Sequence, residues 1–117
     1  MRKVFFLGLI LFYMANTNAS NVGPALPSFI WAQQNGVAFV FFLKNTRTGI
    51  APVCATFGNT SGTYFRYAIN LNTVAGRSQF ALVLAAHSSG ESGYTSGSGA
   101  CDVASDTETL FEFHTAN

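Results

Sequence analysis

The side chains that could carry acid–base or metal chemistry in this sequence are few and widely spaced. The chain has two histidines, His87 and His114, and four carboxylates near its C-terminus: Asp102, Asp106, Glu108 and Glu112. The histidines show no characteristic metal-ligand spacing with these carboxylates, and a packed or surface role is the commoner one for each. Two of the carboxylates could form the pair that glycoside hydrolysis requires. A solvated turn and strand face is the favoured interpretation of this acidic run.

The sequence lacks the motifs of familiar catalytic sites. It has no serine nucleophile elbow, no phosphate-binding glycine loop and no paired-cysteine redox motif. The SGSG segment at residues 96–99 does not qualify, because no helix is expected after it. We therefore predict that the protein is not an enzyme and holds no metal ion or cofactor. A small hydrolase is the least favoured alternative.

Aromatic side chains are abundant and suggest binding instead of catalysis. They make up 15% of the chain, whereas charged residues make up 9%. Tyrosine and tryptophan combine an apolar ring with a polar group, which suits contact with a sugar ring or a protein surface. The candidate ligand-binding residues are Trp31, Tyr64 and Tyr94, although a place in the core or at its rim is the commoner one for each.

The first 19 residues have the pattern of a secretory signal peptide. Arg2 and Lys3 precede an apolar run at residues 4–14, and a polar region then ends at Ala19. The apolar run is too short to span a bilayer, which needs about 20 residues. We expect cleavage between Ala19 and Ser20, and the alternative is an uncleaved anchor or a buried first helix. Cleavage would leave one secreted or periplasmic β-rich domain at residues 20–117.

The charge of that domain excludes some partners. It contains four basic and five acidic side chains, so its net charge is about −1. No basic patch indicates nucleic-acid binding, and no polybasic segment indicates attachment to an anionic membrane. Stable membrane insertion is not expected.

Two cysteines, Cys54 and Cys101, remain after the expected cleavage. In an oxidising compartment a disulfide between them is the favoured state. Closing so long a loop is worth about 4 kcal/mol in the chain-entropy treatment. The alternatives are two free thiols or one catalytic thiol.

Short stretches with strand character are spread along the domain. Residues 37–44 are apolar on both faces, which indicates a central strand or one that meets another subunit, whereas residues 63–71 alternate as in a strand with one wet face. Other strands are expected at residues 28–32, 53–57 and 94–103 and over the last aromatic stretch, residues 110–114. Residues 20–27 are expected to form an extended or poorly ordered arm, and residues 45–52 a loop.

One segment has helical spacing. Phe80, Val83, Leu84 and His87 recur on one face, which predicts a helix from about residue 75 to 89. Asn72 or Thr73 can cap its start, and Gly90 can end it in the left-handed conformation. The fold class is therefore mainly β (α+β): five to six antiparallel strands in a small OB-like barrel or a twisted sheet, with one packed helix.

The segment at residues 94–103 depends on the cross-link. It is rich in glycine and serine, so its strand propensity is low. A disulfide at Cys101 would hold it beside the first half of the chain, whereas without that bond a flexible loop is expected. The turn at residues 58–62 contains Asn59 in a glycosylation pattern, which we interpret as a turn only.

Four segments resemble a group of small secreted bacterial proteins of uncharacterised function. The shared features are a Pro-x-Cys-Ala-Thr segment, a leucine- and alanine-rich helix ending in Ser-Gly, a Gly-x-Gly-x-Cys segment and an acidic turn. In this sequence they lie at residues 52–56, 82–90, 97–101 and 106–108. Where that group would have a lysine and a β-branched pair after the helix, this chain has Glu91, Ser92 and Gly93.

The order of elements is also similar, more loosely, to the pentamer-forming B subunits of bacterial AB toxins of the pertussis and subtilase-cytotoxin type. That similarity implies an OB-like fold, a homo-oligomer and binding of cell-surface glycans, but no glycan-contacting motif can be matched by residue. The expected function is thus a secreted, non-enzymatic binding module. Its partner would be a cell-surface glycan or, alternatively, another secreted protein bound in a structural role.

Overall fold

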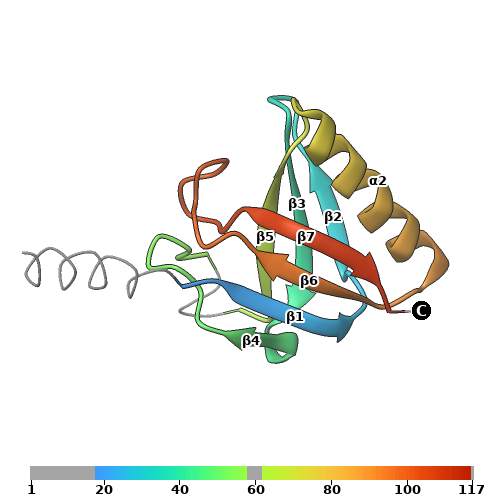
Figure 1. The fold of residues 1–117 in the computed structure, drawn as a ribbon, viewed down its shortest axis with the longest axis horizontal. Helices are drawn as coiled ribbons and strands as arrows, with labels where there is room; N and C mark the ends of the chain where they lie inside the picture. Colours follow the sequence, from blue (N-terminus) through green and yellow to red (C-terminus); the bar gives the residue numbers. More distant parts are fainter. Residues whose placement is uncertain (1–17, 58–61, 117) are drawn as a thin grey trace, which may run out of the picture.

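The computed structural model describes residues 18–57 and 62–116, which form two antiparallel β-sheets and one α-helix (Figure 1). The predicted mainly β fold with one packed helix is confirmed. Its seven described strands form two separate sheets and not a closed barrel. Most of the expected signal peptide, and Asn59, lie outside the described residues.

The three-stranded sheet is built around the most apolar strand of the chain. Its order is β2–β3–β5, and its strands are β2 (Phe29–Ala32), β3 (Val37–Leu43) and β5 (Tyr64–Asn70). One face of β3 packs into the main core, and its other face packs into a smaller aromatic cluster around Phe39 and Phe41. The doubly apolar pattern therefore marks a central strand, as one of the two interpretations predicted.

The four-stranded sheet contains two strands that the sequence did not suggest. Its order is β4–β1–β6–β7, and its strands are β4 (Arg47–Gly49), β1 (Ser20–Ala25), β6 (Gly93–Gly97) and β7 (Leu110–Thr115). Residues 20–27 were expected to form an extended or poorly ordered arm; they are extended, but β1 is a strand paired on both sides and not an arm. The loop expected at residues 45–52 was wrong for residues 47–49, which form β4. Val22 and Ala25 of β1 are buried, and Pro24 lies where the pairing with β6 shifts register. A proline is tolerated at such an irregularity because it has no N–H to donate.

The last strand differs from its expected pattern. A register irregularity interrupts the β6–β7 pairing between Ser96 and Gly97. As a result Phe113 is buried while Phe111 is 65% exposed, so these two rings lie on different faces, although residues two apart in a regular strand share one face.

The helix α2 (Val74–Ser89) matches its predicted limits. The Thr73 hydroxyl accepts a hydrogen bond from the Gly76 N–H at 3.0 Å, and Gly90 ends the helix with φ of 71°. The helix packs against β5 and β7. Its buried side chains include Val83 and Ala86, whereas Leu84, expected on the packed face, is 44% exposed. The packed face is rotated slightly from the one that sequence spacing indicated.

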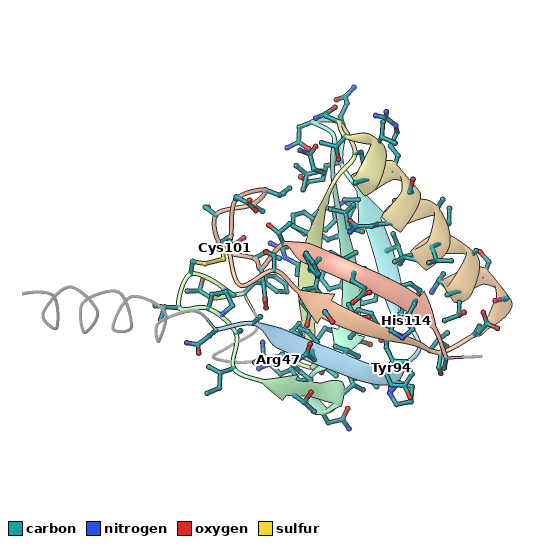
Figure 2. All side chains as sticks on the ribbon, viewed as in Figure 1. Arg47, Tyr94, Cys101 and His114 are labelled. Carbon is teal, nitrogen blue, oxygen red and sulfur yellow. A yellow bond between two sulfur atoms is a disulfide. The ribbon has the colours of Figure 1, made fainter. Side chains whose placement is uncertain are left out.

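The expected disulfide between Cys54 and Cys101 is present, with 6.2 Å between the two Cα atoms (Figure 2). It joins two loops, however, and not two strands. The Ala55 N–H donates to the Pro52 carbonyl in a turn, so residues 53–57 do not form the predicted strand. The strand expected at 94–103 ends at Gly97, and the cysteine follows in the loop.

Candidate functional site

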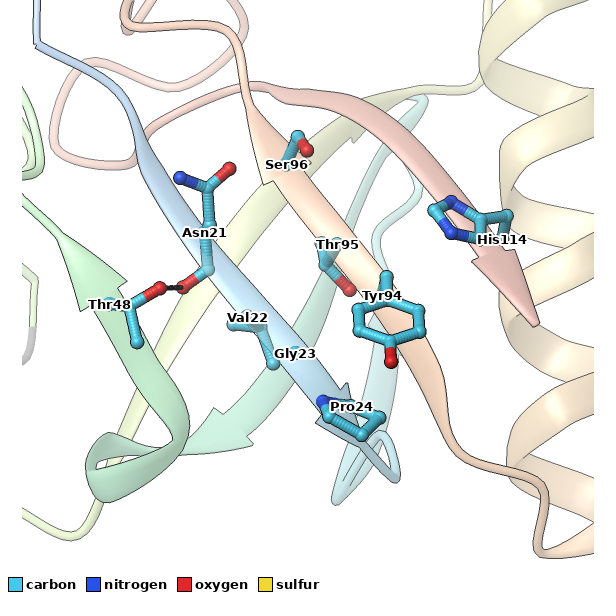
Figure 3. A pocket seen from close by; sticks show the side chains of 9 residues that line it. All are labelled: Asn21, Val22, Gly23, Pro24, Thr48, Tyr94, Thr95, Ser96 and His114. Carbon is cyan, nitrogen blue, oxygen red and sulfur yellow. Dashed lines mark hydrogen bonds between the residues drawn. The ribbon is translucent and has the colours of Figure 1, made fainter. Parts of the chain in front are cut away.

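The outer face of the four-stranded sheet is hollowed into an open depression of about 450 Å³ (Figure 3). It lies across β4, β1, β6 and β7, so every strand of this sheet contributes to it. Its lining residues are Asn21, Val22, Gly23, Pro24, Thr48, Tyr94, Thr95, Ser96 and His114.

Two neighbouring rings form the aromatic part of this depression. Tyr94 of β6 and His114 of β7 are directly paired across the strands. Their ring centroids are 5.2 Å apart and their planes are inclined by only 25°, so the rings stack. The Tyr94 side chain remains 42% exposed. A methyl group built on Gly23 of β1 would lie 2.7 Å from Cδ1 of Tyr94, so glycine there leaves the space that the ring occupies.

A row of polar side chains runs beside these rings. Asn21 is paired with Thr48 on one side and with Ser96 on the other, and Ser96 is paired with Glu112. Neighbouring side chains of such a row stand about 4.8 Å apart, which is the spacing of hydrogen-bonded strands. The polar row lies two residues along the strands from the Tyr94–His114 pair, or about 7 Å. The arrangement offers hydrogen-bonding groups along one side of an exposed aromatic surface.

The other two predicted ligand-binding residues lie on the three-stranded sheet. Trp31 of β2 is 50% exposed, and its ring centroid is 6.0 Å from that of Phe39. Tyr64 of β5 contacts Phe29 edge-on at 5.0 Å. Cross-strand pairing places all four residues on the face of this sheet that points away from the main core. The structure therefore brings Trp31 and Tyr64 onto one face and places Tyr94 on the other sheet.

Arg66 lies on the same outward aromatic face of the three-stranded sheet, a feature that the sequence did not indicate. The Arg66 guanidinium lies 3.9 Å from the ring centroid of Phe39 and 3.8 Å from that of Phe57. It also forms an ion pair with Asp106 at 3.3 Å and donates from Nε to Thr107. These contacts tie the acidic loop before β7 to the three-stranded sheet.

The histidines and carboxylates that could have formed a catalytic site are dispersed. His87 is partly buried, with Nδ1 2.9 Å from the Pro27 carbonyl oxygen, and His114 belongs to the depression. Asp106 pairs with Arg66, as described. Glu108 is only 2% exposed, so the expectation of a solvated acidic run was wrong at this position.

Glu108 belongs to a buried polar cluster with Ser20 and Tyr67. The Ser20 hydroxyl donates to the Glu108 carboxylate at 2.7 Å and shares a 2.8 Å hydrogen bond with the Tyr67 hydroxyl. Burial raises the pKa of Tyr67 strongly; the hydrogen bond that Tyr67 shares with Ser20 opposes this increase and the Glu108 charge adds to it. Tyr67 is therefore a neutral hydrogen-bonding group at physiological pH.

Within residues 18–57 and 62–116, no group of three or more His, Cys, Asp or Glu side chains is arranged to hold a metal ion. Over the same residues, no helix has the length and apolar character needed to cross a membrane.

No protein-family model, no curated protein and no solved structure matches this chain.

Proposed function

We propose that the protein is a secreted, non-enzymatic binding module that binds a glycan at the depression on the four-stranded sheet. The observation that carries the proposal is the stacked Tyr94–His114 pair beside the polar row of Thr48, Asn21 and Ser96. The disulfide is of the kind that persists in an oxidising compartment, which fits a secreted or periplasmic location.

A sugar ring has the two kinds of surface that this site would complement. The apolar C–H face of a pyranose packs against the exposed face or edge of an aromatic ring, and its hydroxyls exchange hydrogen bonds with amide and hydroxyl side chains. The distance of about 7 Å between the aromatic and the polar rows suits one sugar unit that touches both. Because the depression is open and shallow, we expect it to take one or two exposed units of a longer glycan.

A glycan array with the purified, exported protein tests this proposal. Tyr94→Ala should weaken binding to the captured glycan by about 10- to 100-fold, because removing a ring contact costs about 1.5–3 kcal/mol. Tyr94→Phe should retain most of the affinity because the ring remains. Phe111→Ala is the matched control, because this ring is also exposed but lies outside the depression. Equal binding by Tyr94→Ala and the wild type would refute the proposed site.

A second candidate function is the binding of another protein through the three-stranded sheet. Its outward face carries exposed apolar side chains at Phe29 (40%), Trp31 (50%) and Leu43 (41%). Exposed aromatic residues are enriched at protein interfaces, including those between copies of one chain. A homo-oligomer or a secreted protein partner would cover this face.

The single tryptophan distinguishes the two candidates. Trp31 is the only tryptophan of the chain and lies on the three-stranded sheet, away from the depression. Glycan binding at Tyr94 should leave the fluorescence of Trp31 unchanged. A protein partner or a second copy bound to the three-stranded sheet should bury the Trp31 ring and shift its fluorescence emission to shorter wavelength.

A further inference from the structure

The buried carboxylate of Glu108, which contacts the first residue of β1, has no basic side chain as a partner among the described residues. Glu108 is 2% exposed, and no Lys or Arg side chain of residues 18–57 and 62–116 forms an ion pair with it. The groups that do contact it are the Ser20 N–H, at 3.2 and 3.4 Å from the two carboxylate oxygens, the Ser20 hydroxyl at 2.7 Å and the Gly99 N–H at 3.0 Å.

The missing side chain of Gly97 leaves space for this carboxylate next to Ser20. A methyl group built on Gly97 would overlap the carboxylate oxygens, so only glycine fits there. Ser20 itself is 1% exposed. An ionised carboxylate out of water is costly unless an opposite charge and several hydrogen bonds compensate it. The hydrogen bonds are present, and the opposite charge is absent while Ser20 is joined to Ala19 through a peptide bond.

We propose that the α-ammonium group of Ser20, created by removal of residues 1–19, forms a buried ion pair with Glu108 and completes the folded domain. The proposal rests on the expected cleavage between Ala19 and Ser20 and is independent of the ligand. A nitrogen already 3.2 Å from the carboxylate needs little movement to become its cationic partner.

The chemical step is ordinary peptide hydrolysis by a signal peptidase. Water adds across the Ala19–Ser20 peptide bond, so Ala19 gains a carboxylate and leaves with the leader, while the Ser20 nitrogen becomes an amine that takes up a proton. The single N–H donor of the amide is replaced by three N–H donors and a full positive charge. Charge-assisted hydrogen bonds of this kind are about twice as strong as neutral ones.

The surroundings of the new ammonium group favour its charged form. Besides Glu108, the titratable side chain beside Ser20 is Tyr67 of β5, whose pKa burial raises, so it stays neutral over the range in which an amine titrates. Arg47 of β4 is the basic side chain close enough to Tyr67 to influence its pKa, and it lies over the Phe65 ring at 4.9 Å. Its positive charge repels the ammonium group, and Arg47 forms no ion pair with Glu108.

The pKa of the Ser20 amine tests the proposal directly. An α-amine ordinarily titrates at about 7.7–8.0. An ion pair with Glu108 raises that pKa, whereas burial without a partner lowers it. The full chain is exported from a bacterial host in isotope-labelled form, the N-terminus is located by mass spectrometry, and the Ser20 Cα resonance is followed by NMR from pH 6 to 11. We expect a pKa above 8 in the wild type.

Two variants separate the ion pair from simple burial. In Glu108→Gln the Ser20 pKa should fall below the ordinary range, and in Glu112→Gln, which removes an exposed carboxylate of β7, it should not change. If Glu108→Gln does not fold, the wild-type titration alone decides. A wild-type pKa at or below 7.7, or cleavage at a bond other than Ala19–Ser20, would overturn the proposal.

The pH dependence of stability provides a second readout with a defined sign. A raised amine pKa contributes stability that is fully present below the unfolded-state pKa near 8 and is lost as the pH rises through the folded-state pKa. The urea midpoint of the wild type should therefore fall between about pH 8 and pH 10 by more than that of Glu108→Gln. An equal decrease in both proteins would count against the ion pair.

Discussion

Removal of the Cys54–Cys101 disulfide is predicted to lower stability by about 4 kcal/mol while leaving the fold intact. The bond closes a loop with a sequence separation of 47. In the chain-entropy treatment a loop of this length restricts the unfolded chain by about 13–14 cal/mol/K, which is about 4 kcal/mol at 25 °C. A domain of this size has a total stability of about 5–15 kcal/mol, so the loss is a large fraction of it.

The location of the bond explains why the fold should survive. Both cysteines lie in loops, one between β4 and β5 and one between β6 and β7. The strand pairings β3–β5 and β6–β7 are formed by other residues. The loop-to-sheet contacts of Arg66 also hold the acidic loop in place without the cross-link. The bond therefore acts mainly on the unfolded chain.

Urea unfolding followed by Trp31 fluorescence measures the effect. For a slope of about 1–3 kcal/mol/M, a loss of about 4 kcal/mol moves the urea midpoint by about 1.3–4 M. The double variant Cys54→Ala/Cys101→Ala and the chemically reduced wild type should behave alike, because both lack the same constraint. A loss below about 1 kcal/mol would refute the reasoning, since the unfolded chain would then already hold the two loops close together.

Two further substitutions test contacts that position the acidic loop. Arg66→Lys should cost about 1–2 kcal/mol in urea unfolding, because a compact ammonium group lacks the planar, weakly hydrated surface of the guanidinium that contacts the Phe39 and Phe57 rings. An unchanged urea midpoint would show that these cation–π contacts contribute nothing to stability. Gly97→Ala should lower the free energy of unfolding by about 2 kcal/mol or more, because its methyl group would displace the Glu108 carboxylate and disrupt its buried hydrogen bonds. An unchanged urea midpoint would contradict the packing described.

The elements predicted correctly are those whose type is indicated by residues within the element itself or directly beside it. β3 has an uninterrupted run of β-branched and aromatic residues, and α2 combines helical spacing with a Thr73 cap and Gly90 at its end. The disulfide followed from the presence of two cysteines in an expected secreted chain. In each case the signal lies within one segment or in a residue count, so no knowledge of distant partners was needed.

The elements that were missed depend on distant partners. β1 contains a glycine and a proline and lacks strand propensity, yet it is paired with β4 on one side and β6 on the other. Strand formation there follows from tertiary pairing, which no local pattern encodes. The burial of Glu108 is similar, because it depends on Ser20, which lies 88 positions earlier in the chain. The depression was missed for the same reason, apart from Tyr94, whose aromatic type alone marked it as a candidate.

The first strand connects the two sites proposed for this protein. Successive residues of a strand point to opposite faces, so Ser20 reaches the buried cluster while Asn21 faces outward into the depression. A shift of β1 by one residue would exchange these faces, which would bury the Asn21 amide and expose Ser20. An ion pair that fixes the Ser20 nitrogen at Glu108 would therefore also fix the register that places Asn21 beside Ser96 and Gly23 beneath the Tyr94 ring. In this arrangement, removal of the leader would stabilise the domain and set the geometry of its binding surface at the same time.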